Sequence, residues 1–136
     1  MEYLLGTDTC IFCQRERPPE VKEHLEKAGL SAVCMSVITA FEMRYGAERH
    51  PNPIKARANL RAFLLPFRVL PWTDTCASEA ARIRAVLDKR GATMGAYDIQ
   101  IAAHAKVLGM TVVTNNVREF SRVQGLKVVN WCPVKA

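Results

Sequence analysis

Short apolar runs alternate with longer segments of helical periodicity along this chain, and this alternation restricts the fold more than any other feature. Each apolar run has the length of a β-strand, and most of the runs are separated by one or two amphipathic segments. Successive strands joined through helices need right-handed crossovers, which place the strands side by side and parallel. The sequence therefore predicts an α/β fold, a three-layer α/β/α arrangement with a mostly parallel central sheet. The predicted strands are 3–5, 30–35, 68–70, 110–114 and 127–129.

Capping residues indicate where the helices between these strands begin and end. A first helix begins near Thr9 and is stopped by Pro18 and Pro19. Gly29 closes the second helix, and Ser36 is a candidate N-cap for the third. The remaining predicted helices are 54–63, a long one from a cap at Thr73 or Asp74 to Arg90, and one around Asp98 that ends at Gly109, followed by a short turn at 115–120.

Length and composition suit one domain over residues 1–136, since the 136 residues are 49% hydrophobic. No apolar run approaches the ~20 residues of a membrane span, and the N-terminus lacks the pattern of a secretory signal. The five cysteines are an odd number, and three lie in apolar or helical segments, which is typical of reduced thiols. We therefore expect a cytoplasmic protein with no membrane partner.

Two carboxylates, Glu42 and Asp98, fall on the apolar stripes of predicted helices. Glu42 has Ile38 at i−4 and Tyr45 at i+3, and Asp98 has Ile101 at i+3. Burying an ionised carboxylate without compensation costs several kcal/mol, so a cation, a hydrogen-bond network or a raised pKa is expected there. A structural ion pair with an arginine is the alternative for each acid alone.

Polar residues from four separate segments are predicted to meet at one edge of the sheet. Gly6 to Asp8 follow the first strand, Asn115 and Asn116 follow the strand at 110–114, and Glu42 lies on the helix after the second strand. Asp98 is in the first turn of its helix, where the helix dipole favours an anion. Because ligands gather at the carboxyl ends of parallel strands, this convergence outweighs the ion-pair alternative.

The motifs around these residues resemble a known family. LLGTD after the first strand, SVITAFE, YDIQIAAHA and VTNNVREF resemble, in order and spacing, the PIN-domain ribonucleases of the VapC toxin type. RIRAVL in the long helix and GL before the last strand extend the resemblance over nearly the whole chain. It implies a PIN-like fold and a metal-dependent endoribonuclease that cleaves structured RNA, often a transfer or ribosomal RNA loop. It also implies a VapB-type antitoxin partner, a homodimer and a higher-order complex with the antitoxin.

By this resemblance, Glu42 and Asp98 match metal-binding acids, with Mg²⁺ or Mn²⁺ as the implied cofactor. Such hard cations prefer oxygen ligands. Asn116 stands where a neutral oxygen can coordinate, and Thr114 matches a hydroxyl residue that supports the cluster. Glu119 is close enough to add a carboxylate, although a surface position is favoured for it.

The chain departs from the family pattern at Gly6. Members usually carry Asp at this position as a principal metal ligand, whereas this chain reads Leu5-Gly6-Thr7-Asp8. Asp8 is a possible substitute, but only if the helix starts late, because residues two apart share a face in extended chain and diverge in a helix. We expect Asp8 to keep a capping or supporting role, so that cleavage is impaired.

The net charge of +6 fits a polyanionic partner, and Arg44, Arg118 and Arg122 are candidate phosphate contacts. Two other functions stay open: an inactive PIN protein that only binds RNA or antitoxin, and a thiol redox protein using Cys10 and Cys13. The C-x-x-C pair opens a helix, where a thiol pKa is lowered. Glu79 is expected to be a solvated residue. The predicted antitoxin groove comprises Ile11, Phe12, Ile54, Leu60 and Phe63.

Overall fold

The computed structural model describes residues 1–133 and contains a five-stranded sheet in which all paired strands run parallel. The strand order is β3-β2-β1-β4-β5, so the first strand lies at the centre and the order reverses between β1 and β4. The predicted α/β fold class is confirmed, and the sheet is more regular than predicted, since each described pair is parallel. The strands are β1 (Tyr3–Leu5), β2 (Val33–Ser36), β3 (Arg68–Leu70), β4 (Thr111–Val113) and β5 (Val128–Val129).

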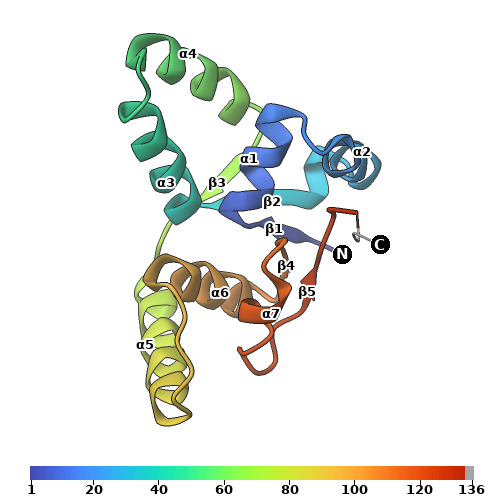
Figure 1. Cartoon of the computed structure of the whole chain (residues 1–136). Helices are drawn as coiled ribbons and strands as arrows, with labels where there is room; N and C mark the ends of the chain where they lie inside the picture. The colour runs from blue at the N-terminus through green and yellow to red at the C-terminus, as the bar shows by residue number, and fades with distance from the viewer. Residues whose placement is uncertain (134–136) are drawn as a thin grey trace.

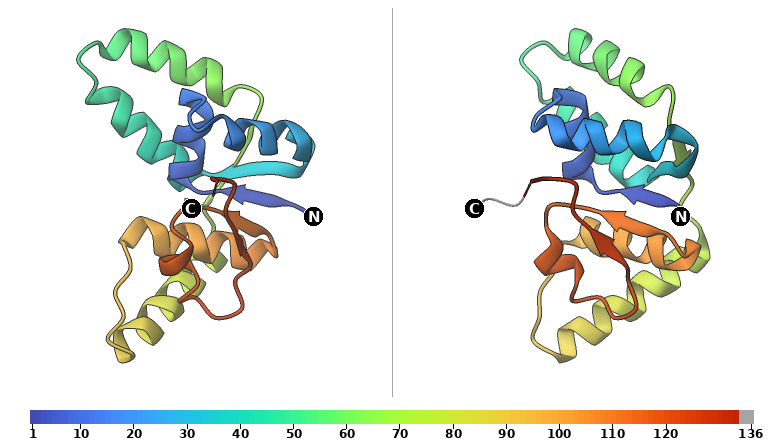
Figure 2. Two further views of the ribbon diagram at one scale, coloured as in Figure 1. Left: turned by 45° about the vertical axis from the view of Figure 1, so that its right-hand side comes forward. Right: turned by 90° about the vertical axis from the view of Figure 1, so that its right-hand side faces the viewer.

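Helices cover both faces of this sheet, as Figures 1 and 2 show. The first four helices lie on one side, and α3 and α4 form a hairpin that extends away from the sheet (Figure 1). The last three helices lie on the other side. The helices are α1 (Thr7–Arg15), α2 (Pro19–Ala28), α3 (Val37–Glu48), α4 (Pro53–Leu64), α5 (Asp74–Lys89), α6 (Ala96–Leu108) and α7 (Val117–Phe120), with a 3₁₀ turn at Leu30–Ala32.

Alternating strand residues fill two cores, one on each side of the sheet. Leu4 pairs with Val112 and is buried with α5 and α6. Leu5 pairs with Val113 and is buried with α1 to α4. Because successive side chains of a strand point to opposite faces, the continuous apolar runs of the sequence follow from this double burial.

Three boundaries differ from the sequence prediction. α1 begins at Thr7 and not near Thr9, because the Gly6 carbonyl already accepts a hydrogen bond from the Cys10 amide at 3.1 Å. The second strand is shorter than 30–35 predicts, since a 3₁₀ turn takes its first residues. The predicted turn at 115–120 contains the four-residue helix α7.

The predicted caps are present and fix the helices that carry the site. Ser36 Oγ accepts a hydrogen bond from the Ile38 amide at 3.0 Å and starts α3. Thr73, the first of the two alternatives, caps α5. Gly109 ends α6 with a φ of +67°, a conformation that favours glycine. Between residues 1 and 133, no helix combines the length and the apolar character that crossing a membrane requires.

Candidate functional site

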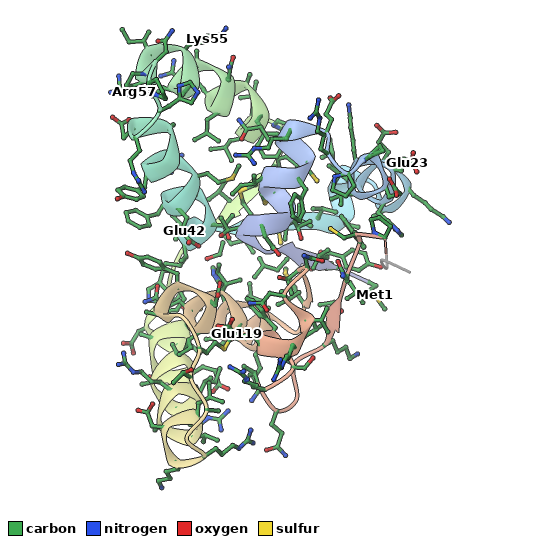
Figure 3. The ribbon with its side chains drawn as sticks, viewed as in Figure 1. Met1, Glu23, Glu42, Lys55, Arg57 and Glu119 are labelled. Atoms are coloured by element: carbon green, nitrogen blue, oxygen red, sulfur yellow. The ribbon has the colours of Figure 1, made fainter. Side chains whose placement is uncertain are left out.

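The carboxyl ends of β1 and β4 and the beginnings of α1, α3, α6 and α7 bring the predicted polar residues together. Figure 3 labels two of them, Glu42 on α3 and Glu119 on α7. Glu42 comes from the helices on one face of the sheet and Glu119 from those on the other face, at the end of the sheet where the order of strands reverses. This is the position where parallel sheets usually bind ligands.

Asp98 is the most perturbed acid of this cluster. Its side chain is half-buried in the first turn of α6, and its pKa is raised to about 6, first by burial and then by the carboxylates of Glu119, Glu42 and Asp8. The three neighbours come from three other elements, so the fold places four carboxylates within electrostatic reach of one another. Such mutual repulsion is what a bound cation would relieve.

Glu42 is half-buried and held by a neighbouring helix. Thr7 Oγ1 donates a hydrogen bond to Glu42 Oε1 at 2.7 Å and lies 3.2 Å from Thr39 Oγ1. The expectation that Glu42 points into packed protein beside Tyr45 is wrong in part, because Tyr45 is 54% exposed. α3 packs through the face that carries Thr39 and Met43, so Glu42 lies at the border of this face, where it stays accessible.

Gly6 is buried at the end of β1, and its backbone does not require glycine. Its φ of −67° and ψ of 161° are extended values that any residue adopts. A Cβ added here would lie 3.0 Å from the Val113 carbonyl oxygen and 3.1 Å from Asp8 Oδ1. An aspartate at position 6 therefore needs shifts of a few tenths of an ångström, both at the Val113 carbonyl and at the Asp8 carboxylate.

Asp8 is tied to the end of β4. Its Oδ1 accepts a hydrogen bond from the Thr9 amide at 2.8 Å, and its Oδ2 accepts from Asn115 N at 2.9 Å and Thr114 Oγ1 at 3.1 Å. α1 has already started at Thr7, so the late helix start that substitution requires does not occur. These donors engage both oxygens, which suits a residue that fastens α1 to β4.

Thr114, Asn116 and Glu119 form one connected network. The buried Thr114 hydroxyl donates to Asp8 and accepts from the Asn116 amide at 3.0 Å. Asn116 Nδ2 donates to Glu119 Oε2 at 2.6 Å, and the Gly95 amide donates to Glu119 Oε1 at 2.9 Å. Thr114 is thus a supporting residue, and Asn116 is exposed beside it.

Glu119 does more than occupy the surface position that was favoured for it. It is half-buried and joins the start of α6 to α7. The signal in the sequence was its spacing, because Glu119 lies three residues after Asn116, the residue that precedes the first turn of α7. An acid at this spacing stands near the free amides of a helix start.

The three candidate arginines occupy different environments. Arg44 and Arg118 are exposed on α3 and α7. Arg122 is half-buried: its guanidinium donates to the Thr93 carbonyl, and its own carbonyl accepts from Arg90 at 3.1 Å. Arg122 thereby holds the loop before α6, a structural role that its spacing did not reveal.

The prediction that Glu79 is only a solvated residue is also corrected by the structure. It pairs with Arg82 and, at 3.1 Å, with Lys106 of α6, so it joins α5 to α6 instead of being simply solvated. The hydrogen bond from Arg82, followed by the one from Lys106, lowers the pKa of Glu79.

Cys10 and Cys13 are buried, and the cysteines of residues 1–133 are free thiols. Burial raises the pKa of Cys10 well above its usual value and that of Cys13 to about 11. Thiols of this kind carry little thiolate at neutral pH and react slowly. The C-x-x-C pair therefore packs α1 against its core, which argues against the thiol redox alternative.

A groove of about 500 Å³ runs between α1, α3 and α4 and reaches Glu42. Of the predicted groove residues, Ile11 and Leu60 line it. Ile54 is 77% exposed outside this lining, whereas Phe12 and Phe63 pack against the core. The other residues of the groove are Gln14, Arg15, Glu42, Met43, Gly46, Ala47, His50, Lys55, Ala56 and Asn59.

Known proteins resemble this chain over nearly its full length. A profile of the PIN domain matches residues 7–126. A tRNA(fMet)-specific endonuclease VapC of Salmonella typhimurium is 37% identical over 132 residues, which are 97% of this chain and 99% of that protein. Ribonuclease VapC2 of Haemophilus influenzae is 36% identical over 96% of this chain and 98% of its own length.

Solved structures give the same result for the fold. The structure of DNA-bound VapBC from Salmonella typhimurium superposes with a TM-score of 0.91 at 37% identity, covering 97% of this chain and 99% of the other. VapBC2 from Rickettsia felis, bound to a promoter DNA fragment, has a TM-score of 0.89 at 28% identity, covering 97% of this chain and 100% of the other.

Proposed function

Because the chain belongs to the PIN-domain family and to its VapC-type ribonucleases, we propose that it is an endoribonuclease toxin whose metal site is weakened at Gly6. The observation that carries the proposal is the cluster around Asp98, where burial and then three other carboxylates raise the pKa of this acid to about 6. A relative 37% identical to this chain is named for cleavage of tRNA(fMet), which makes this RNA the first substrate to test.

The residues present fit a divalent cation only in part. Glu42 and Asp98 supply the hard oxygen atoms that Mg²⁺ or Mn²⁺ prefers, and Glu119 is the next carboxylate. Within residues 1–133, however, no three His, Cys, Asp or Glu side chains come close enough together to hold a metal ion. Position 6 is where a further carboxylate would complete the set, since Gly6 is buried beside Asp8 and Thr114.

The chemistry that such a site supplies when loaded is activation of water and neutralisation of the charge that develops on the phosphate. The chain contributes the geometry: Thr7 orients Glu42, and the first turn of α6 presents Asp98 to the same space. Glu119 holds Gly95 and Asn116, so the loop before α6 and the start of α7 keep a fixed spacing. Asn116 supplies a neutral oxygen at the rim.

A VapB-type antitoxin is the protein partner that follows from membership, since the structural relatives are VapBC complexes. The groove between α1, α3 and α4, about 500 Å³ in volume, has Glu42 in its lining. A segment that enters it would lie next to the acids and close the site to RNA. The homodimer and the cytoplasmic location stay predictions.

A second function is favoured by one observation, the absence of a side chain at Gly6. A PIN protein with two accessible acids and no carboxylate at this position binds RNA or antitoxin without cleaving. The two functions differ in one measurement, Mg²⁺-dependent cleavage by the unmodified chain.

The test is cleavage of initiator tRNA by the unmodified chain and by Gly6→Asp, each with Mg²⁺, with Mn²⁺ and with a chelator. We expect Gly6→Asp to cleave at least about 10- to 100-fold faster, because loss even of a residue that only supports a metal ligand costs this much. Ala81→Asp is the matched control, since it adds the same charge at an exposed position of α5, outside the site.

Equal rates for the unmodified chain and Gly6→Asp contradict the weakened site. No cleavage by either protein, with both folded, favours the second function. Isothermal titration of Mn²⁺ into both proteins separates metal binding from turnover, and we expect the tighter site in Gly6→Asp.

A further inference from the structure

The start of α6 is held by a residue of another helix. Gly95 is the N-cap of α6, and because it has no side chain it cannot accept a hydrogen bond from the amides of the first turn. Its own amide donates to Glu119 Oε1 of α7 at 2.9 Å, across 24 residues of sequence. The cap of α6 is thus completed from outside the helix.

Asp98 is the residue that would ordinarily accept this amide. It is the third residue of α6, and an acid at this position commonly reaches back to the N-cap amide, as in a capping box. Asp98 lies close enough to do so, since its Oδ2 would be 3.4 Å from a Cβ on Gly95. Within residues 1–133, however, no donor is hydrogen bonded to the Asp98 carboxylate. A half-buried acid is therefore left without a bond beside an amide that another acid occupies.

A second hydrogen bond keeps Glu119 in this place. Asn116 Nδ2 donates to Glu119 Oε2 at 2.6 Å, so each oxygen of the Glu119 carboxylate has its own donor. Asn116 is fixed in turn, because its backbone amide donates to the buried Thr114 hydroxyl at 3.0 Å. An aspartate at position 116 would have no hydrogen to donate and would repel Glu119. The neutral amide at position 116 and the acid at position 119 therefore act as a pair.

We propose that Glu119 is a positioning residue, which caps α6 in place of Asp98 and so leaves the oxygens of Asp98 free for the site. The proposal rests on the endoribonuclease function, in which Asp98 is a metal-binding acid. If Asp98 bonded to the Gly95 amide, an oxygen available to a cation would be exchanged for a local hydrogen bond. Glu119 removes this competition, because the amide has one hydrogen and Glu119 already accepts it.

The competing role for Glu119 is that of a further metal ligand beside Glu42 and Asp98. Both roles predict slower cleavage when the Glu119 side chain is removed, so a single variant does not separate them. The two roles differ in the effect of removing the Gly95 amide hydrogen as well. Without this hydrogen Asp98 has nothing to turn toward, whereas a missing ligand stays missing.

The first test is hydrogen exchange of the Gly95 amide, followed by NMR in the absence of metal. In Glu119→Ala the amide should stay protected, because Asp98 turns back and accepts it. In Glu119→Ala/Asp98→Ala the protection should fall by at least about tenfold, as expected when a hydrogen bond to a charged acceptor is lost. If exchange in Glu119→Ala is already as fast as in the double variant, Asp98 does not compete for the amide and the proposal is wrong.

The second test is cleavage of initiator tRNA with Mg²⁺ in the Gly6→Asp background. Glu119→Ala should cleave about 10- to 100-fold more slowly, the loss expected for a residue that supports a metal ligand. Adding Gly95→Pro removes the amide hydrogen and should restore most of the lost rate. Proline suits this position, because Gly95 has a φ of −57° and a ψ of 143°, close to the −69° and 150° of Pro18, the N-cap of α2.

Two further variants separate capping from charge and from folding. Glu119→Gln keeps an oxygen for the Gly95 amide, so it should cleave faster than Glu119→Ala although both lose the same charge. Glu23→Ala removes the same charge from an exposed position of α2, on the other side of the sheet from Glu119 (Figure 3), and should leave cleavage unchanged. Thermal melting reports whether each variant is folded.

The outcomes distinguish the cap from the function. If Gly95→Pro restores no cleavage to Glu119→Ala, a metal ligand or a purely structural residue explains the loss, and the proposal is wrong. If no protein cleaves, the ribonuclease function fails, and the hydrogen-exchange test still decides whether Glu119 keeps Asp98 from the Gly95 amide.

Discussion

Two aspartates hold equivalent places in this molecule and differ in their surroundings. Asp8 lies in the first turn of α1 and Asp98 in the first turn of α6. Asp8 accepts hydrogen bonds from Thr9, Thr114 and Asn115, which fasten α1 to β4. Asp98 is half-buried among carboxylates, and its pKa is raised to about 6.

The difference teaches that position in a helix does not assign a role to an acid. Both aspartates benefit from a helix dipole, but only Asp8 has donors on both oxygens. Asp98 is surrounded by like charge instead, a condition that lowers stability and attracts a cation. The four predictions below test this contrast between a structural and a functional aspartate.

The largest expected effect is on catalysis. In the Gly6→Asp background, Asp98→Asn should lower the rate of Mg²⁺-dependent cleavage of initiator tRNA by at least about 100-fold, because it removes a ligand oxygen and its charge. Asp8→Asn in the same background should stay within about tenfold. Initial rates measure both, and similar losses for the two variants would show that Asp8 is also a ligand.

The second effect is on stability. The same substitution, Asp98→Asn, that lowers the cleavage rate should make the fold more stable. Asp98 prefers its protonated form in the folded state, so its ionisation destabilises the fold as pH rises from about 4 through about 6. In chelator above pH 7, Asp98→Asn should raise the free energy of unfolding by up to about 2 kcal/mol, since solvent screens part of the effect at a half-buried carboxylate, and below pH 4 the gain should vanish. Urea unfolding across this pH range checks it, and a pH-independent difference would contradict the raised pKa.

Replacing Asp8 should lower the stability of the fold, whereas replacing Asp98 should raise it. Asp8→Ala removes the acceptor that joins the Asn115 amide and the Thr114 hydroxyl, so we expect unfolding to become easier by about 1.5–3 kcal/mol at neutral pH. Asp74→Ala is the matched control, since Asp74 is an exposed aspartate in the first turn of α5. Loss of its interaction with the helix dipole should cost about 0.3–1 kcal/mol. If chemical denaturation gives the same loss of unfolding free energy for Asp8→Ala and Asp74→Ala, the hydrogen bonds from Asp8 to the end of β4 add no stability.

The smallest effect concerns the origin of the Asp98 pKa. Glu119→Gln removes the neighbouring charge that acts most strongly on Asp98 and keeps an oxygen for the Gly95 amide. The Asp98 pKa should fall by a fraction of one pH unit, as followed by carbon-13 NMR of the side-chain carboxyl. Glu79→Gln, between α5 and α6, should leave it unchanged; a drop there would point to a long-range charge effect.

Much of the fold was predictable because local rules act on local sequence. Ser36 and Thr73 have the side chains that cap helices, and they do so in the structure. Thr9 was mispredicted as the start of α1, since the Gly6 carbonyl begins the helical bonding two residues earlier. That bond depends on β1 ending just before Gly6, whose amide donates a hydrogen bond to the Val113 carbonyl of a distant strand.

The candidate site was predictable as a set of residues and not as a set of roles. Glu42 and Asp98 were identified by their spacing, and their convergence follows from the parallel sheet. Glu119 was expected at the surface and Arg122 as an RNA contact, and each also holds a loop near the start of α6, a role that was not predicted. Their partners, Gly95 and Thr93, are more than twenty residues away in the chain, so no local pattern indicates them.

The sequence by itself determined the alternation of strands and helices, the acids at positions 42 and 98, and the glycine at position 6, because hydrophobic period and residue chemistry are local properties. Only the tertiary structure decided that Asp8 is bonded to β4 while Asp98 is left among like charges. Hydrogen bonds and pKa values depend on distances across the sheet, and these exist only after β1 and β4 have paired.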